Sequence, residues 1–199
     1  MSGTESSAER ATNATETHLD VFSPEELSTE LELDGRLLYL NTDYRDILDI
    51  IGILHGKHPY PIKARACLEI FVDNWEDIKD GQRAMLALYN FIDCGEKPQN
   101  TKGLPKELDW KVDFSAIISD MNKVSKVEDI RAVPYMHWFT FISIFNAIGE
   151  GNLSHRIGIR RKIRKHEKLS PDEIDWATRN PDKLLIERDR YSDDDDEED

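Results

Sequence analysis

The clearest hydrophobic pattern lies between residues 30 and 54, where two short apolar strands precede an amphipathic helix. Leu31 and Leu33 alternate with glutamates, and an apolar strand returns at 36–40 after Asp34-Gly35. An Asp-Gly dipeptide accepts the positive φ angles of a two-residue type I′ turn. The segment therefore predicts a β-hairpin.

The residues after the hairpin have the three- and four-residue apolar spacing of a helix. We expect Asn41 or Thr42 to cap this helix, with Asp43 in its first turn. The chain should thus change from strand to helix at Thr42. The apolar positions of the helix are Tyr44, Ile47, Leu48, Ile51 and Leu54.

The same spacing predicts further helices along the chain. Pro134 suits a first helical position, and Ser170-Pro171-Asp172-Glu173 is a capping box. The segment 134–148 is apolar on nearly every side, which predicts a central helix buried all round; at about 15 residues it is too short to span a membrane. The connection 96–109 contains two prolines and should be a loop. The additional helices are expected at 62–72, 82–94, 114–121, 134–148, 156–168 and from 170 onward.

Charge is concentrated at the two ends of the chain. The net charge is −14 over 199 residues, yet residues 1–32 hold eight acids and one base, and residues 193–199 are all acidic, so that 33–192 sum to zero. Such ends lack apolar periodicity and favour disorder. The sequence predicts a mainly α fold: a small helical domain at 24–188 with one N-terminal hairpin near 30–40, and disordered acidic termini at 1–23 and 189–199.

Several segments resemble the bacteriophage gene-product-fifteen family, whose members lie among tail-assembly genes. The hairpin leading through Asn-Thr-Asp-Tyr-Arg into a helix is similar to the start of that family. The segments YNFIDCG at 89–95, YMHWFTFISIF at 135–145 and GEGNLSHRIGIR at 149–160 follow in the family's order. The resemblance spans roughly residues 27–186; the basic run after Leu153 and the acidic tail depart from it.

This resemblance implies a non-catalytic phage tail-assembly chaperone, which keeps the long helical tape-measure protein soluble until the tail tube forms. The tail-tube protein or a second tail chaperone are further expected partners, and self-association stays open. The resemblance implies a protein of the host cytoplasm that is absent from the mature virion. Two alternatives are a structural tail or connector protein retained in the virion, and a nucleic-acid-binding regulator.

A run of basic residues at 156–168 is the strongest candidate for partner binding. On a helix its bases form a stripe, which suits an acidic protein surface, nucleic acid or plain solvation. Nucleic acid is disfavoured because no aromatic residues alternate with the bases. The acidic C-terminal tail is a further, internal partner for the stripe. The candidate partner-binding residues are Arg156, Arg160, Arg161, Arg164 and Lys165.

No combination of residues predicts catalysis, a metal or a cofactor. Cys67 and Cys94 lie in helical apolar patterns and should be reduced core residues of a cytoplasmic protein. His55 and His58 have no third ligand nearby, which favours a loop over a metal pair. His137 has no neighbouring carboxylate or nucleophile, so we expect a core histidine. The N-terminus has no positive start followed by an apolar block, so no signal peptide is predicted.

Overall fold

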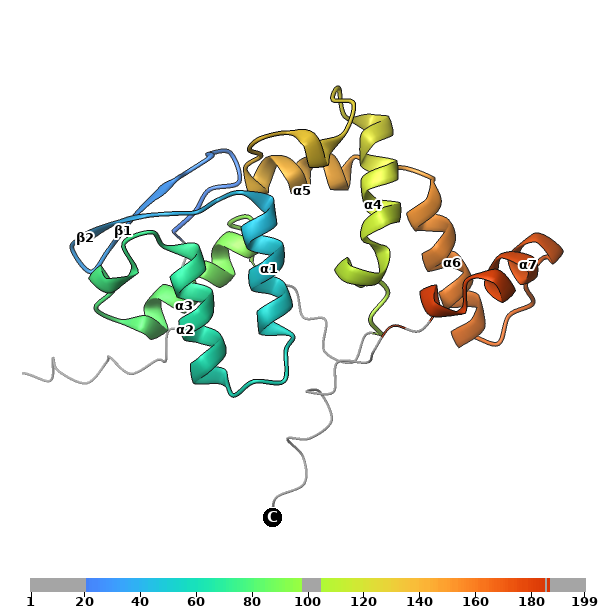
Figure 1. Cartoon of the computed structure of the whole chain (residues 1–199), viewed down its shortest axis with the longest axis horizontal. Helices are drawn as coiled ribbons and strands as arrows, with labels where there is room; N and C mark the ends of the chain where they lie inside the picture. The colour runs from blue at the N-terminus through green and yellow to red at the C-terminus, as the bar shows by residue number, and fades with distance from the viewer. Residues whose placement is uncertain (1–20, 98–104, 185, 187–199) are drawn as a thin grey trace, which may run out of the picture.

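The helices form an arch-like body with the hairpin at one side. The computed structural model describes residues 21–97, 105–184 and 186, which contain seven α-helices and one β-hairpin. Figure 1 shows the hairpin with α1, α2 and α3 on one side, α4, α6 and α7 on the other, and α5 near the top between them. One cluster of buried apolar side chains runs through both sides. The predicted mainly α fold with an N-terminal hairpin is confirmed for these residues.

The hairpin forms where the Asp-Gly turn predicts it. Strands β1 (Glu30–Leu33) and β2 (Arg36–Tyr39) pair antiparallel, with Leu33 opposite Arg36. Asp34 and Gly35 have φ angles of 51° and 69°, as a type I′ turn requires. The inward leucines of both strands are buried, so the alternating pattern determines the face that packs on the core.

Helix α1 (Tyr44–Leu54) is capped by Asp43, whose carboxylate accepts a hydrogen bond from the Arg45 amide at 2.9 Å. The prediction of Asn41 or Thr42 as cap is wrong, because both side chains have distant partners. The side-chain Nδ2 of Asn41 donates to the Ile70 carbonyl at 2.8 Å. The Thr42 hydroxyl lies 2.7 Å from the Tyr135 hydroxyl.

Helices α2 (Tyr60–Phe71) and α3 (Gly81–Ile92) complete the first side, with α2 packed against both α1 and α3. The short 3-10 helix η1 (Trp75–Asp77) connects them. Both helices begin slightly earlier than predicted, α3 because Asp80 caps it by accepting from the Gln82 and Arg83 amides. The predicted stop at Gly95 is confirmed by its φ of 74°.

The domain begins earlier than the predicted boundary at residue 24. Phe22 is buried and its ring meets Phe91 edge-on at 5.0 Å. The Asn90 side-chain oxygen accepts from the Val21 and Phe22 amides at 3.1 Å. A Cβ at Gly95 would lie 2.4 Å from the Phe22 carbonyl oxygen, so this close approach requires glycine. Residues 21–23 thus belong to the domain; the rest of the two predicted tails, 1–20 and 189–199, lies outside the described residues.

Helix α4 (Trp110–Val124) is longer than the predicted 114–121 segment. Asp109 caps it by accepting from the Lys111 and Val112 amides at 2.9 and 3.0 Å. The cap ends the predicted 96–109 loop at its last residue. Residues 98–104 of that loop lie outside the described residues.

Helix α5 (Trp138–Asn146) starts later than predicted, and Pro134 is not its first residue. Residues 134–137 are instead extended beside 42–44: the Trp138 amide donates to the Thr42 carbonyl at 2.8 Å, and the Tyr44 amide donates to the Met136 carbonyl at 3.0 Å. The expected burial on all sides is also wrong, because only residues 138, 139 and 141 of this helix are buried. No helix in the described ranges is long and apolar enough to cross a membrane.

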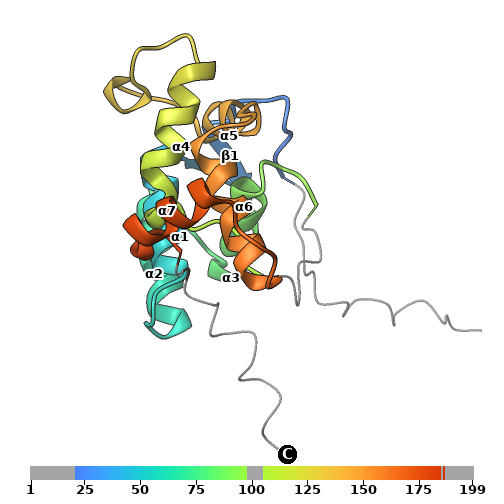
Figure 2. The ribbon, with the colours of Figure 1, turned by 90° about the vertical axis from the view of Figure 1, so that its right-hand side faces the viewer.

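Helices α6 (Asn152–Arg164) and α7 (Pro171–Arg179) form the end of the molecule farthest from the hairpin (Figures 1 and 2). The predicted capping box is confirmed: the Ser170 hydroxyl accepts from the Glu173 amide at 3.3 Å, and the Glu173 carboxylate accepts from the Ser170 amide at 2.8 Å. Two further 3-10 helices are η2 (Ile130–Ala132) and η3 (Pro181–Lys183).

His137 is the buried core histidine that the sequence predicts. Its Nδ1 accepts from the Phe139 amide at 3.1 Å and so caps α5, while its Nε2 lies 3.2 Å from the Ser28 carbonyl. These partners require a neutral ring with the proton on Nε2. Burial lowers the pKa of His137 below its ordinary value of 6.5, although the Ser28 carbonyl partly opposes this shift.

We expect the domain to lose stability in mild acid because of His137. A histidine with a lowered folded-state pKa contributes its full stability above about pH 6.5, and the contribution falls as the pH drops below that value. The free energy of unfolding in urea should therefore decrease between pH 7.5 and pH 5.5. His137→Asn retains a capping side chain without a titrating ring, so its decrease should be smaller. Equal decreases in both proteins would contradict the assignment.

Candidate partner-binding site

Arg160, the centre of the predicted basic stripe, is an interior residue. Its side chain is 3% exposed and its guanidinium makes two hydrogen bonds, of 2.7 and 2.8 Å, to the buried Asp113 carboxylate on α4. It also donates to the carbonyls of Glu107 and Lys183 at 3.0 and 2.6 Å. The prediction that Arg160 lies on a partner-binding surface is therefore wrong: this residue joins α6 to α4 and η3.

Other bases of the stripe are paired within the domain. Arg161 binds the Glu107 carboxylate through Nε at 2.6 Å, and Arg164 lies 3.7 Å from the same carboxylate. The hydrogen bond from Arg161 lowers the pKa of Glu107 below its ordinary range. Arg156 lies 3.7 Å from Asp113 and is largely buried. Among the predicted site residues, Lys165 at the helix end is exposed and has no ion pair within the described residues.

A groove between α1 and α4 has a volume of about 1200 Å³. Figure 1 shows α1 and α4 apart from each other below α5. Side chains of α1 and of the first turns of α4 line the groove. The groove also receives residues of the 105–109 segment. Its apolar lining is made by Leu48, Ile51, Leu108, Trp110 and Phe114.

Both walls of this groove are fixed by aromatic packing against α5. Tyr44 on α1 stacks on Phe141 with ring centroids 4.4 Å apart. Trp110 on α4 packs on Phe145 at 5.1 Å and on Trp138 at 6.2 Å. Since α5 supports both walls, the apolar lining of the groove is formed before any partner binds. This preorganisation lowers the entropic cost of binding.

One wall of this groove is partly predictable from the sequence. Leu48 and Ile51 belong to the predicted apolar face of α1, but they remain half-buried. Trp110 precedes the predicted 114–121 helix, so the apolar spacing does not indicate its place in the groove. The useful signal is an apolar helix face that is wider than one neighbouring helix covers.

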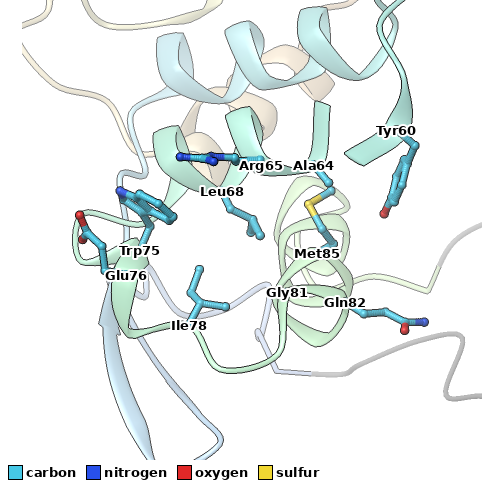
Figure 3. A pocket seen from close by; sticks show the side chains of 10 residues that line it. All are labelled: Tyr60, Ala64, Arg65, Leu68, Trp75, Glu76, Ile78, Gly81, Gln82 and Met85. Atoms are coloured by element: carbon cyan, nitrogen blue, oxygen red, sulfur yellow. The ribbon is translucent and has the colours of Figure 1, made fainter. Parts of the chain in front are cut away.

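A second, smaller groove of about 530 Å³ lies among α2, α3 and η1. Figure 3 shows Leu68, Ile78 and Met85 pointing into it, with Trp75 and Arg65 at one end. The Arg65 guanidinium lies 5.4 Å from the Trp75 ring centroid and also pairs with Glu69 at 2.7 Å. Its charged end is thus already engaged in contacts within the domain.

The described residues hold no group of three or more histidine, cysteine or acidic side chains placed to bind a metal ion. His55, which follows the last residue of α1, has its Nδ1 2.8 Å from the Ile51 carbonyl of that helix. Burial raises the pKa of the Cys67 thiol and raises that of Cys94 to about 12. A thiol with a raised pKa is a poor nucleophile at neutral pH.

Comparison of the chain with protein-family profiles, curated proteins and solved structures finds no match.

Proposed function

We propose that this chain is a non-catalytic tail-assembly chaperone that binds helical segments of a phage tape-measure protein. The proposal rests on the resemblance of 31–54, 89–95, 135–145 and 149–160 to the gene-product-fifteen family. The groove between α1 and α4 is the structural observation that carries it. It places the protein in the host cytoplasm and outside the mature virion.

The groove suits the physical task of covering an amphipathic helix. A long helix with an exposed apolar stripe aggregates unless that stripe is covered. A helix is about 10–12 Å wide with its side chains, and groove-binding helices insert residues at three- and four-residue steps. Leu48, Ile51 and Phe114 offer half-buried apolar surface between two walls, where such residues can bind and release.

Gly52 provides a direct test, because it lines the groove on α1 and a Cβ built there meets no atom within 4 Å. Gly52→Trp should fill the groove without straining the helix. Co-expression with the tape-measure protein of the same phage should keep that protein soluble, and Gly52→Trp should abolish the effect. The measurement is the soluble fraction of the tape-measure protein after centrifugation.

Two controls separate groove filling from other effects. Gly52→Ala should stabilise the domain by about 0.5–1 kcal/mol and preserve the chaperone effect, since alanine favours helix without filling the groove. Gly158→Trp adds the same ring on α6, where a Cβ also meets open space. A tape-measure protein equally soluble without this chain would overturn the function. If Gly52→Trp keeps the tape-measure protein fully soluble, the client binds to a surface other than this groove.

Mass spectrometry of purified virions distinguishes the chaperone from the alternative, a structural protein retained in the virion. A structural protein should be found in the particles, and a chaperone should be absent from them. The alternative of nucleic-acid binding is weakened by the burial of Arg160 and by the pairing of Arg161 with Glu107. Nucleic-acid affinity needs exposed bases that displace counterions from phosphates.

A further inference from the structure

We infer that the groove between α1 and α4 selects amphipathic helices that carry basic residues along one side of the apolar stripe and acidic residues along the other. This inference rests on the proposed helix-binding function and adds the chemistry of the client. The observation that carries it is the opposite charge of the two walls, after the charges already paired within the domain are set aside.

Most charged side chains that line the groove have internal partners. Arg45 binds the Asp43 carboxylate at 2.9 Å and the Val133 carbonyl at 2.6 Å. Lys106 pairs with Asp109 at 3.2 Å, while Arg131 pairs with Asp129 at 2.7 Å. Because each pair is close to neutral, these groups add little field across the groove.

Two lining charges remain, one on each wall. Asp49 on α1 and Lys111 on α4 are exposed, and neither has an ion pair among the described residues. The α1 wall is therefore acidic and the start of α4 is basic.

A helix lying on the apolar lining would place the two flanks of its stripe against these two walls. A basic flank beside Asp49 and an acidic flank beside Lys111 make two favourable contacts. A helix with two acidic flanks keeps the contact with Lys111 but is repelled by Asp49. A helix with two basic flanks keeps the contact with Asp49 but is repelled by Lys111. Such contacts contribute selectivity more than raw affinity.

The test uses three fluorescein-labelled synthetic helical peptides of about 20 residues with one apolar stripe and different flanks: mixed, all acidic and all basic. Fluorescence anisotropy with the full chain should show the mixed peptide binding about threefold to tenfold more tightly at low ionic strength. The preference should fade at high salt. Equal affinities would overturn the inference, as would failure of all three peptides to bind.

Charge reversal of each wall gives a sharper result. Asp49→Lys makes both walls basic and should shift the preference to the all-acidic peptide, whereas Lys111→Glu should shift it to the all-basic peptide. Asp73→Lys and Lys168→Glu reverse exposed charges that do not line the groove, and they should leave the preference unchanged. An unchanged preference in the two groove variants would overturn the inference.

These outcomes are independent of the tape-measure experiment. If the peptides bind with the expected preference but the tape-measure protein gains no solubility, the selectivity of the groove stands and the chaperone role fails. If the tape-measure protein is protected and Gly52→Trp removes protection, while the three peptides bind equally, the groove stands and the charge selectivity fails.

Discussion

Arg160→Glu should unfold the C-terminal half of the domain, whereas Arg161→Glu, one position further on, should leave it folded. The Arg160 and Asp113 side chains are 3% and 0% exposed, and the substitution would bury two facing carboxylates without a cation. Breaking a buried pair costs about 3–5 kcal/mol, a large part of the roughly 5–15 kcal/mol that stabilises a typical domain. Arg161 is 55% exposed, so the loss of its pair should cost at most about 1 kcal/mol.

The measurement is urea denaturation followed by circular dichroism and by tryptophan fluorescence, which reports on all four tryptophans, including Trp110 in α4 and Trp176 in α7. A double variant distinguishes the uncompensated charge from lost packing: Asp113→Leu with Arg160→Met should recover much of the stability, because an apolar pair of similar volume avoids the desolvation cost. Equal stability of Arg160→Glu and Arg161→Glu would show that Arg160 does not hold α6 to α4.

The basic stripe shows what local sequence reasoning misses. The segment 156–168 contains many basic residues and a single acidic one, and this excess of positive charge predicts an exposed basic surface. Their partners come from elsewhere: Asp113 is 47 positions from Arg160, and Glu107 is 54 positions from Arg161. Spacing along one helix identifies its faces, but tertiary packing decides which face is buried.

Elements specified by neighbouring residues were predictable. The Asp34-Gly35 turn and the reciprocal Ser170–Glu173 cap each involve residues within three positions, and both form as expected. The start of α5 was not predictable from Pro134, because residues 134–137 are held extended by hydrogen bonds to 42–44. The groove likewise depends on how α5 spaces α1 and α4, which no single segment encodes.

Trp138→Ala is expected to destabilise the whole domain and to weaken the binding of helical peptides with it. The Trp138 side chain is 2% exposed, and its Nε1 donates to the Ile92 carbonyl at the end of α3 at 2.9 Å. Its ring stacks near Phe141 at 5.7 Å and contacts Trp110, a wall of the groove. Truncation would leave a cavity and a buried carbonyl without its donor, at a cost of about 3–5 kcal/mol.

Two matched substitutions make this prediction specific. Trp138→Phe retains an aromatic ring and loses mainly volume and the hydrogen bond, so its loss of unfolding free energy should be smaller than that of alanine. Trp176→Ala on α7 removes a half-buried ring that contacts His155 edge-on at 5.7 Å, and should cost about 1–2 kcal/mol. Because Trp138 supports Trp110, peptide binding should fall in Trp138→Ala even in the fraction that remains folded, and stay intact in Trp176→Ala. If both alanine variants unfold at the same urea concentration, Trp138 does not have the central packing role that its burial indicates.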